Sequence, residues 1–458
     1  MKNTVRLEAL RFKNVKNVKN GTLYFCEQKK LERGEYDEDS LSSVLGIYGQ
    51  NGSGKTTALD ALRMIQIFLS SSGVGGEFVN LINAYDDYML VGADFFVKIG
   101  SSKYYVYYDI QIKKNNKNRL HIEAEKLSYF KYSDQKKNNL FEFQFSDHIK
   151  DSFLNKLSSK DKVIYQYTAS IETNSETNNG IALSSIFNRK LLSILIQNKE
   201  SLKEYCDIVN ALSDFGRNNL AIYSINYFNE NESVGIKFRV KDKDNGVNVI
   251  GDMFVPFRSW ALDSRSFKYF RQLIDQVNKV MPSIIPDYSI LINETNSSEV
   301  QRITNRVEFI LTSKRGNGKP IPLLYESNGI KKIISILSGL IDAYSNEGCL
   351  MAIDEIDSGI FEYLLGEIVY AFDNFGRGQL IFTSHNMRVL EKVHYKNIFF
   401  TTTDLNNAFI QLTNVRDTNN LRDMYYKFIA NGYQESIKLY DMVKTEELVN
   451  ALYVGKKD

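Results

Sequence analysis

The residues best suited to chemistry form a glycine-rich run that ends in a lysine and a threonine. Residues 49–56 read Gly-Gln-Asn-Gly-Ser-Gly-Lys-Thr, which matches the pattern G-x-x-x-x-G-K-[ST] in full. Glycines let the backbone turn so that successive N–H groups face an anion, and a helix beginning near Lys55 adds the positive end of its dipole. The pattern predicts a cradle for nucleotide phosphates, in which Lys55 reaches the β- and γ-phosphates and the Thr56 hydroxyl is a ligand of Mg²⁺.

The surroundings of this run favour a phosphate loop over a glycine-rich turn that carries a lysine by chance. An apolar strand at residues 44–48 precedes it, and apolar residues at helical spacing follow it. We therefore expect ATP and Mg²⁺ as ligands. The residues predicted to bind the nucleotide are Gly49, Asn51, Gly52, Ser53, Gly54, Lys55, Thr56 and Thr57.

A second motif is an apolar run that ends in two acids, Cys-Leu-Met-Ala-Ile-Asp-Glu at residues 349–355. Five apolar residues are typical of a buried parallel strand, and open α/β sheets bind ligands at the carboxyl ends of their strands. Asp354 is predicted to hold Mg²⁺ through its water shell, and Glu355 to orient and deprotonate the attacking water. Two acids after a strand also begin loops or cap helices, but their occurrence with a phosphate loop favours the catalytic interpretation.

Two further segments flank this acidic strand. His385 follows an apolar strand at residues 379–383, a position from which a histidine can contact a γ-phosphate. Residues 326–329, Glu-Ser-Asn-Gly, precede a helix with an apolar face. Ser327 would be a suitable N-cap in any protein, so this segment gains a functional meaning only together with the other motifs. The predicted catalytic residues are Lys55, Glu355 and His385.

The elements that must position these motifs alternate between strands and helices at both ends of the chain. Residues 1–110 contain apolar-alternating strands and the phosphate loop, and residues 301–405 return to the same α/β pattern. Between them, residues 111–300 contain aromatic strands and short helices, which predicts an inserted α+β accessory lobe. Residues 406–458 are predicted to form a helical tail. The sequence contains no sustained heptads, so we do not expect a long coiled coil.

In this order the motifs resemble those of the ABC, SMC and RecF ATPases, and most closely those of the OLD-like prokaryotic ATPases. Such proteins share a Walker A loop, a degenerate Glu-Ser-x-Gly signature, a Walker B strand ending in Asp-Glu, and a switch histidine after a strand reading Gln-Leu-Ile-Phe-Thr. The resemblance covers about residues 1–110 and 300–405. It implies an α/β fold of the ABC type: a split P-loop NTPase with a mixed sheet, flanking helices and an inserted lobe.

The resemblance also implies a head-to-tail homodimer or a higher homo-oligomer. Each ATP would be bound by the Walker A loop of one subunit and by Ser327 and Gly329 of the other, because a helix N-terminus with a serine hydroxyl suits a γ-phosphate. Asp357 resembles the D-loop residue of the family. The Q-loop glutamine of the family is not identified, since Gln111 is predicted to lie within a strand. Asn328 stands where many transporters carry glycine, which favours the non-transporter branch.

Three functions fit this resemblance. The first is a sensor or regulatory ATPase of a prokaryotic antiviral defence system of the abortive-infection kind, which controls a separate effector such as a nuclease. The second is a RecF- or SMC-like DNA-repair ATPase that clamps DNA and needs a basic surface. The third is an OLD-type nuclease, but the segment after Thr403 contains nothing like the Toprim domain of those enzymes. The missing coiled coil and the near-neutral charge argue against the second function, and the first is favoured chiefly on the family resemblance.

Composition sets limits on these functions. The chain is 43% hydrophobic and 24% charged, as in ordinary globular proteins, and its net charge is +2. A nucleic-acid partner would therefore depend on a local basic patch such as residues 113–119, which is also typical of a solvated hairpin loop. No apolar stretch approaches about 18 residues and no apolar signal region begins the chain, so we expect a cytoplasmic protein without a membrane partner. Cys26, Cys206, Cys349 and the histidines show no disulfide or zinc spacing.

One stretch of the inserted lobe combines arginines with aromatic residues. This composition is enriched at protein–protein hot spots, so the stretch is a candidate docking surface for an effector. It is also typical of an amphipathic helix over residues 265–281 that buries its aromatics in its own lobe, and this second interpretation is favoured. The residues concerned are Arg258, Trp260, Arg265, Phe267, Tyr269, Phe270 and Arg271.

Overall fold

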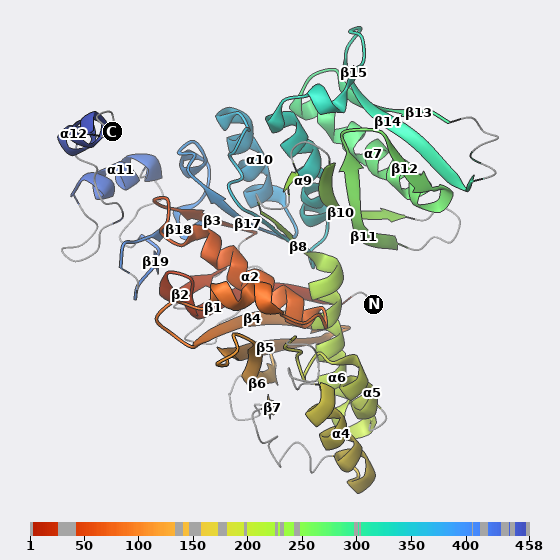
Figure 1. Ribbon diagram of the computed structural model, residues 1–458, viewed down its shortest axis with the longest axis vertical. Helices are drawn as coiled ribbons and strands as arrows, with labels where there is room; N and C mark the ends of the chain where they lie inside the picture. Colours follow the sequence, from red (N-terminus) through yellow and green to blue (C-terminus); the bar gives the residue numbers. More distant parts are fainter. Residues whose placement is uncertain are drawn as a thin grey trace.

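The computed structural model of this chain consists of stacked sheets with helices between and around them (Figure 1). Cys26 and part of the predicted tail between residues 406 and 458 lie outside the residues that the structure describes. The described residues are 3–25, 43–132, 141–145, 157–172, 181–196, 199–224, 228–229, 233–241, 248–296, 301, 304–404, 406–412, 420–431, 439 and 445–454.

An antiparallel sheet with the strand order β2-β1-β4-β5-β6-β7 contains the N-terminus. The hairpins β4–β5 and β5–β6 are continuous in sequence, and β1 lies between β2 and β4. Buried and half-buried residues alternate along most of β5, as expected for a strand with one face on a core. The strands are β1 (Thr4–Val15), β2 (Val18–Tyr24), β4 (Tyr88–Ile99), β5 (Ser102–Lys114), β6 (Leu120–Lys131) and β7 (Phe141–Phe145).

A mostly parallel sheet follows the order β19-β18-β3-β17-β16-β8. Alternate residues of its strands enter two different hydrophobic cores: Leu45 and Ile47 of β3 enter one, and Val44 and Tyr48 enter the other. A parallel sheet is buried on both faces in this way, which explains its nearly continuous apolar strands. The strands are β3 (Val44–Tyr48), β8 (Leu220–Tyr223), β16 (Leu350–Ile353), β17 (Gln379–Ser384), β18 (Ile398–Thr401) and β19 (Phe409–Ile410).

Helix α2 (Lys55–Leu69) fills the space between these two sheets (Figure 1). Its buried residues share one core with β1, β4 and the inward residues of β3, which confirms the predicted amphipathic helix after the glycine-rich run. On the other face of the parallel sheet lie α9 (Asn328–Ser345) and α10 (Glu362–Phe375), whose buried residues belong to the second core. The parallel sheet is therefore the middle layer of the molecule.

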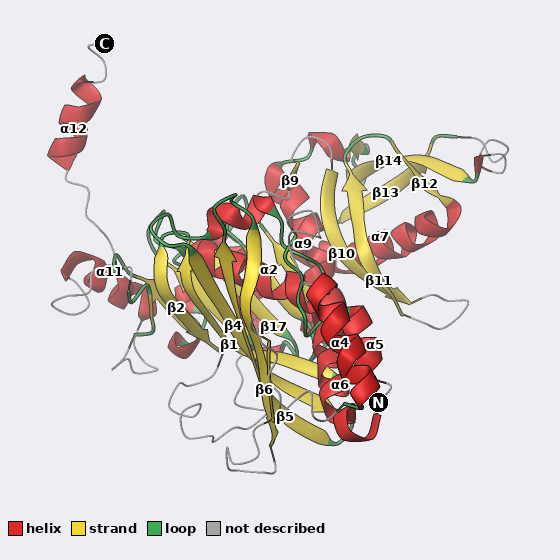
Figure 2. Cartoon of the chain, turned by 60° about the horizontal axis from the view of Figure 1, so that its bottom comes forward, coloured by secondary structure: helices red, strands yellow, loops and turns green. Residues whose placement is uncertain are grey.

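Helices α4 (Ser159–Glu172), α5 (Arg189–Ile196) and α6 (Lys199–Asp214) pack together beside the antiparallel sheet (Figure 2). The segment before α5 is attached to the sheet through Glu125, a buried residue of β6. The Glu125 carboxylate accepts hydrogen bonds from the Ser184 hydroxyl (2.5 Å), the Tyr108 hydroxyl (2.8 Å) and the Ser185 N–H (2.8 Å). Burial raises the pKa of Glu125, and these donors lower it in compensation.

A pair of smaller sheets and helix α7 form a separate layer next to α9 (Figure 1). One sheet has the order β11-β10-β9, and the other has the order β12-β14-β13 with β15 paired to β14. The elements are β9 (Phe228–Asn229), β10 (Ser233–Lys241), β11 (Asn248–Pro256), β12 (Trp260–Asp263), α7 (Ser264–Ile284), β13 (Tyr288–Glu294), β14 (Arg306–Arg315) and β15 (Ile321–Pro322).

The aromatic residues of α7 are buried in this layer. Phe267 and Phe270 pack on the ring of Phe309 in β14, and Tyr269 belongs to the same core. The structure thus agrees with the interpretation of an amphipathic helix, and the hypothesis of a partner contact is not supported for these aromatics. Trp260 is 41% exposed. Arg258, Arg265 and Arg271 are exposed as well.

The predicted fold class is confirmed, because the parallel sheet combines a strand from the first predicted ATPase lobe with strands from the second. The sheets do not follow the predicted lobe ranges residue by residue. Strand β5 continues across residue 110 and includes Gln111, and β8, within the predicted insertion, pairs in parallel with β16. The division into lobes at 1–110, 111–300 and 301–405 remains a prediction.

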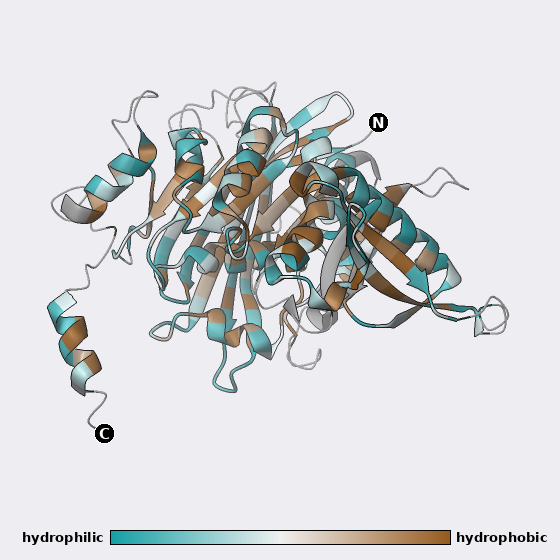
Figure 3. Cartoon of the chain, turned by 90° about the horizontal axis from the view of Figure 1, so that it is seen from above, coloured by the Kyte–Doolittle hydropathy of each residue, from teal (hydrophilic) through white to brown (hydrophobic). Residues whose placement is uncertain are grey.

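The C-terminal elements lie to one side of the sheets. Helix α11 (Leu421–Asn431) contacts the parallel sheet through Tyr425, whose ring stacks on Phe400 with 4.8 Å between centroids. Helix α12 (Thr445–Val454) stands away from the rest of the chain (Figure 2). Apolar residues are concentrated along the central strands, and polar residues dominate the outer loops (Figure 3). Among the described helices, none combines the length and the apolarity that a membrane crossing requires.

Short helical segments complete the described chain. They are η2 (Gly76–Leu81), the π-helical η4 (Phe215–Asn219), η6 (Leu323–Tyr325), η7 (Val389–Glu391) and η8 (Tyr395–Asn397).

The side chain of Gln379 forms hydrogen bonds that join the two large sheets. Strand β2 pairs with β1 from Ala9 to Val15, so the edge of β1 at Leu7 lies beyond this ladder. There the Gln379 side chain donates to the Leu7 carbonyl and accepts from the Leu7 N–H, both at 2.8 Å. Both residues are at most 1% exposed. The amide of Gln379 therefore replaces a neighbouring strand at this point of the edge.

Gln379→Leu is expected to destabilise the chain by about 2–4 kcal/mol, because two buried backbone groups of Leu7 lose their partners while the side-chain volume is nearly retained. The free energy of unfolding in urea measures the effect. Gln411→Leu is the matched control: Gln411 also donates to a backbone carbonyl, that of Lys396, but at an exposed position. A loss at Gln379 no larger than at Gln411 would contradict a role in joining the sheets.

Candidate nucleotide-binding site

The predicted motifs meet at one edge of the parallel sheet. Strands β3, β17 and β16 are parallel neighbours, and Ile47 pairs with Thr383 while Ile353 pairs with Phe382. Because carboxyl ends of parallel strands share one edge of a sheet, the residues that follow these strands are brought together. The glycine-rich run follows β3, Asp354 follows β16, and His385 follows β17.

The glycine-rich run curves over the end of β18. Gly49 has a φ of +155°, and a Cβ atom there would lie 1.6 Å from Oγ1 of Thr401, so only glycine fits. Thr401 is fully buried and shares a hydrogen bond of 2.5 Å with the Ser53 hydroxyl, which also contacts the Gln50 carbonyl at 2.6 Å. Thr401 therefore holds the loop against the end of β18, through its hydrogen bond with Ser53 and its contact with Gly49.

The start of α2 is open to an anion. Gly54 is its N-cap in the left-handed conformation, and no side chain in the described part of the chain caps this helix end. Its first N–H groups are thus left without side-chain acceptors. Asn17, at the turn between β1 and β2, donates to the Gly52 carbonyl at 2.6 Å and accepts from the Thr57 hydroxyl at 3.4 Å. Asn51 is exposed at the outside of the loop.

Lys55 folds back over its own loop. Its Nζ donates to the carbonyls of Gly49 (2.8 Å) and Gln50 (2.9 Å), and the residue is 7% exposed. Burial lowers the pKa of Lys55, and the nearby carboxylates of Asp354 and Glu355 oppose this shift. An ammonium group held at the mouth of a phosphate loop is suited to a phosphate oxygen.

Asp354 links the glycine-rich run to the acidic strand. Its Oδ2 accepts from the Thr56 hydroxyl at 3.0 Å, and its Oδ1 accepts from the Thr383 hydroxyl at 2.5 Å. A hydroxyl and a carboxylate are the hard oxygen donors that Mg²⁺ prefers, and Mg²⁺ sites often combine one carboxylate with phosphate oxygens. Thr56 and Asp354 are thus close enough to serve one Mg²⁺ site.

Glu355 has an unusual backbone. Its φ is +45°, in the left-handed region that residues other than glycine rarely adopt and that costs about 1–3 kcal/mol. The Glu355 N–H donates to the Thr383 hydroxyl at 2.7 Å, and its carbonyl accepts from Nζ of Lys332. Backbone strain of this kind occurs at functional sites when the surroundings hold it in place. The half-buried Glu355 lies directly beside Asp354 at the edge of the site.

His385 and Asp357 form the outer side of the site. The His385 N–H donates to Oδ2 of Asp357 at 3.1 Å. Oδ1 of Asp357 is buried without a hydrogen-bond partner among the described residues. Burial lowers the pKa of His385, and the charge of Lys55 lowers it further, so the neutral imidazole is favoured at neutral pH.

Ser327 and Gly329 lie at the start of α9. Ser327 is the N-cap of this helix and accepts from the Ile330 N–H at 3.3 Å, as its sequence position predicts. A Cβ atom on Gly329 would lie 1.9 Å from the carbonyl oxygen of Gly359, so the helix start is pressed against the turn after Asp357. Gly329 thus contacts the turn after Asp357 in its own chain, a turn that we call the acidic turn together with Asp354 and Glu355.

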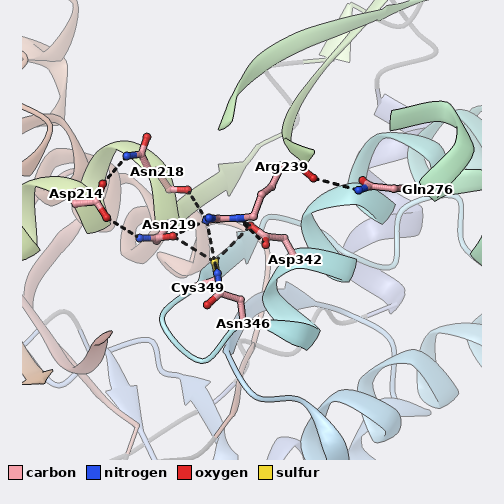
Figure 4. A network of polar contacts seen from close by, with 8 residues as sticks. All are labelled: Asp214, Asn218, Asn219, Arg239, Gln276, Asp342, Asn346 and Cys349. Atoms are coloured by element: carbon pink, nitrogen blue, oxygen red, sulfur yellow. Dashed lines mark hydrogen bonds and ion pairs between the residues drawn. The ribbon is translucent and has the colours of Figure 1, made fainter. Parts of the chain in front are cut away.

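A polar network lies behind the acidic strand (Figure 4). Arg239 of β10 forms an ion pair of 2.9 Å with Asp342 of α9, and it donates to the Asn219 side chain at 2.6 Å. The Cys349 thiol, one residue before β16, donates to Asp342 (3.4 Å) and accepts from Asn346 (3.0 Å). The network connects β10, α9 and the beginning of β16, the acidic strand.

Arg239→Met is expected to lower the free energy of unfolding by about 2–3 kcal/mol, because the partly buried Asp342 carboxylate loses its cation. The two side chains are 15% and 23% exposed. In the control Arg271→Met the lost pair with Glu294 is 53% and 36% exposed, and a change within about 1 kcal/mol is expected. Equal changes in urea denaturation of both variants would show that the network contributes no more than a surface pair.

Several residues of this site are not evident from sequence motifs. Asn17, Lys332, Thr383 and Thr401 each hold a motif residue, but each comes from an element distant in sequence from the residue it contacts. Thr383 carries a weak signal, since it is a hydroxyl residue that directly follows the apolar residues of β17. The others lack a signal in a single sequence.

Residues 140–391 match the protein family described as "AAA domain, putative AbiEii toxin, Type IV TA system". This range is more than half of the chain, and it contains the signature segment, the acidic strand and His385. No curated protein matches the chain.

Solved structures that are similar to this chain at low sequence identity include two SMC head domains and a RecF protein. An Smc head domain with an extended coiled coil, bound to the C-terminal domain of ScpA and derived from Pyrococcus furiosus, is 14% identical, with 94% of this chain and 100% of that chain covered and a TM-score of 0.42. The recombination mediator protein RecF with ATP is 15% identical (83% and 94% covered, TM-score 0.35). The SMC head domain from Thermotoga maritima is 11% identical (89% and 98% covered, TM-score 0.34).

Proposed function

Because the chain belongs to the family described as "AAA domain, putative AbiEii toxin, Type IV TA system", we propose that its phosphate loop binds ATP and that the acidic turn after β16 hydrolyses it. The chain is a P-loop ATPase of the ABC, SMC and RecF type in its motifs and its sheet order. The observation that carries the proposal is the contact of 3.0 Å between Thr56 and Asp354, which joins the phosphate loop to the acidic strand.

Each residue of the site has a role in the proposed reaction. Lys55 and the N–H groups at the start of α2 bind the phosphates, and Thr56 and Asp354 would hold Mg²⁺, which would supply positive charge against the phosphates. Glu355 accepts a proton from the attacking water. The oxygen of this water bonds to the γ-phosphorus, while the bond between the γ-phosphorus and the oxygen that leaves with ADP breaks. His385 donates a hydrogen bond from its imidazole N–H to the γ-phosphate.

The proposed active form is a head-to-tail dimer, in which Ser327 and Gly329 of one copy contact the nucleotide of the other. Support comes from the geometry of α9, whose N-terminus carries a serine cap and the positive end of a helix dipole. The contact of Gly329 with Gly359 keeps this helix end beside the acidic turn. Nucleotide binding in one copy is thereby linked to the turn that contains Asp357 in the other.

For the biological role, we propose a sensor or regulatory subunit of a prokaryotic antiviral defence system whose ATP-dependent assembly controls a separate effector. The family description names an AbiEii toxin of a Type IV TA system, which supports a functional partner. Co-purification with the product of a neighbouring gene, in the presence of ATP, tests for that partner. A partner that binds equally well without nucleotide would argue against ATP-dependent control.

The enzymatic proposal is tested by phosphate release from ATP. We expect turnover that requires Mg²⁺ and stops when EDTA is added, because Thr56 and Asp354 need the ion to act on the phosphates. Absence of turnover with bound ATP and Mg²⁺ would overturn the proposal. Tight duplex DNA binding, with an affinity that falls steeply as salt increases, would instead favour the DNA-clamping function.

A further inference from the structure

Lys332 is a buried cation beside the acidic turn that no motif of the sequence explains. It lies just after the first turn of α9, five positions after Ser327, and is 8% exposed. Its Nζ donates a hydrogen bond to the carbonyl oxygen of Glu355. A lysine is rarely buried without a function for its charge.

The charges of three carboxylates in the turn from Asp354 to Asp357 act on this ammonium group. Burial lowers the pKa of Lys332, and the charges of Asp357, Glu355 and Asp354 oppose that shift. The same three carboxylates act on Lys55 from the phosphate loop. The carboxylates of this turn therefore act on two lysines, Lys55 of the phosphate loop and Lys332 of α9.

The hydrogen bonds of Glu355 explain why such a contact matters. Its backbone lies in the left-handed region, and this conformation fixes the direction of its Cα–Cβ bond. Thr383 of β17 holds the N–H of this residue, and Lys332 of α9 holds its carbonyl. Both peptide groups beside the strained Cα are therefore held by side chains from other elements, as a strained functional residue requires.

We propose that Lys332 is a positioning residue for hydrolysis, which holds the Glu355 carbonyl and thereby keeps the Glu355 carboxylate aimed at the attacking water. The inference rests on the proposed ATPase function. Because Lys332 lies near the start of α9, whose N-cap is Ser327, it also connects the signature segment with the proposed catalytic base. Its role is exerted through Glu355, without a contact to the nucleotide.

The neighbouring Lys331 provides a matched control. It is 9% exposed and belongs to the same turn of α9, but its Nζ lies over the ring of Phe257 at 4.9 Å from the centroid. Lys331→Met therefore removes an equally buried charge from the same helix without affecting the acidic turn. Differences between the two variants report the Glu355 contact and not the loss of a buried lysine.

In the test, steady-state ATP hydrolysis is measured for the wild type, Lys332→Met, Lys332→Arg and Lys331→Met, together with their thermal unfolding. We expect Lys332→Met to lower kcat by about 10-fold or more with KM changed by less than about 2-fold, since a misaimed base affects the transition state and not ATP binding. Lys332→Arg, which retains a donor, should recover kcat to within about 3-fold of the wild type. Lys331→Met should retain the wild-type kcat.

Two outcomes would overturn the inference. The first is a kcat of Lys332→Met equal to that of Lys331→Met. The second is a parallel change of kcat, KM and unfolding temperature without recovery by Lys332→Arg, which would indicate a purely structural role. A wild type that binds ATP without hydrolysing it would instead overturn the proposed function, so the two failures are distinguishable.

Discussion

Glu355→Gln is expected to retain binding of ATP and Mg²⁺ and to slow hydrolysis by about 10² or more, because an amide can orient water but cannot accept its proton. The substitution preserves the size of the side chain and the backbone bonds to Thr383 and Lys332, so the left-handed turn should persist. Single-turnover phosphate release measures the chemical step. In the proposed dimer, ATP that is not hydrolysed should hold two copies together, and sedimentation with ATP should show a heavier species than without it.

Glu362→Gln is the control for this experiment, since Glu362 is an exposed carboxylate in the first turn of α10. It should hydrolyse ATP at the wild-type rate. Normal turnover by Glu355→Gln would assign the general base to another residue. Slow turnover without an ATP-dependent heavier species would retain Glu355 as the base and argue against the head-to-tail dimer.

Lys55→Ala is expected to weaken ATP binding by about 10²-fold or more, because the phosphates lose a charge-assisted contact at the centre of the loop. The fold should persist, since Nζ of Lys55 contacts only loop carbonyls of Gly49 and Gln50 among the hydrogen bonds described. Equilibrium titration with a fluorescent ATP analogue measures the affinity, and thermal unfolding without nucleotide checks the fold.

Lys319→Ala is the matched control for Lys55→Ala, because Lys319 is exposed in the turn between β14 and β15. It should bind the analogue with wild-type affinity. An unchanged affinity of Lys55→Ala would contradict the assignment of the glycine-rich run as the phosphate loop. A large drop in its unfolding temperature would instead show that Lys55 stabilises the loop itself.

The candidate residues for chemistry could be proposed from the sequence because each motif is contiguous. The glycines in the run from Gly49 to Thr56 indicate a tight turn from local sequence alone. The residues before Asp354 are consecutively apolar, as in a strand that is buried on both faces. The edge at which they meet follows from the parallel order of β3, β17 and β16, which a sequence of alternating strands and helices indicates only in outline. The roles assigned to Ser327 and Gly329 across a dimer remain a prediction.

The long aromatic middle of the chain was the least predictable part. A stretch of arginines and aromatics has the same composition whether it docks a partner or packs on its own sheet. The structure decided this for α7, where Phe267 and Phe270 pack on Phe309, a residue that follows them only after another strand. Strand β8 likewise joins the parallel sheet by pairing with β16. Because β16 lies far along the chain, no local pattern predicts this pairing.

The sequence by itself determined the phosphate loop, the acidic strand and the helices after them, because short-range spacing and local hydrogen bonding suffice for these features. Only the tertiary structure decided how the catalytic candidates are held. Thr383 lies 29 positions from Asp354, and Thr401 lies 348 positions from Ser53, so neither contact follows from a local pattern. The left-handed backbone of Glu355 is likewise a product of its surroundings, since glutamate does not favour it and Thr383 and Lys332 must hold it from two other elements.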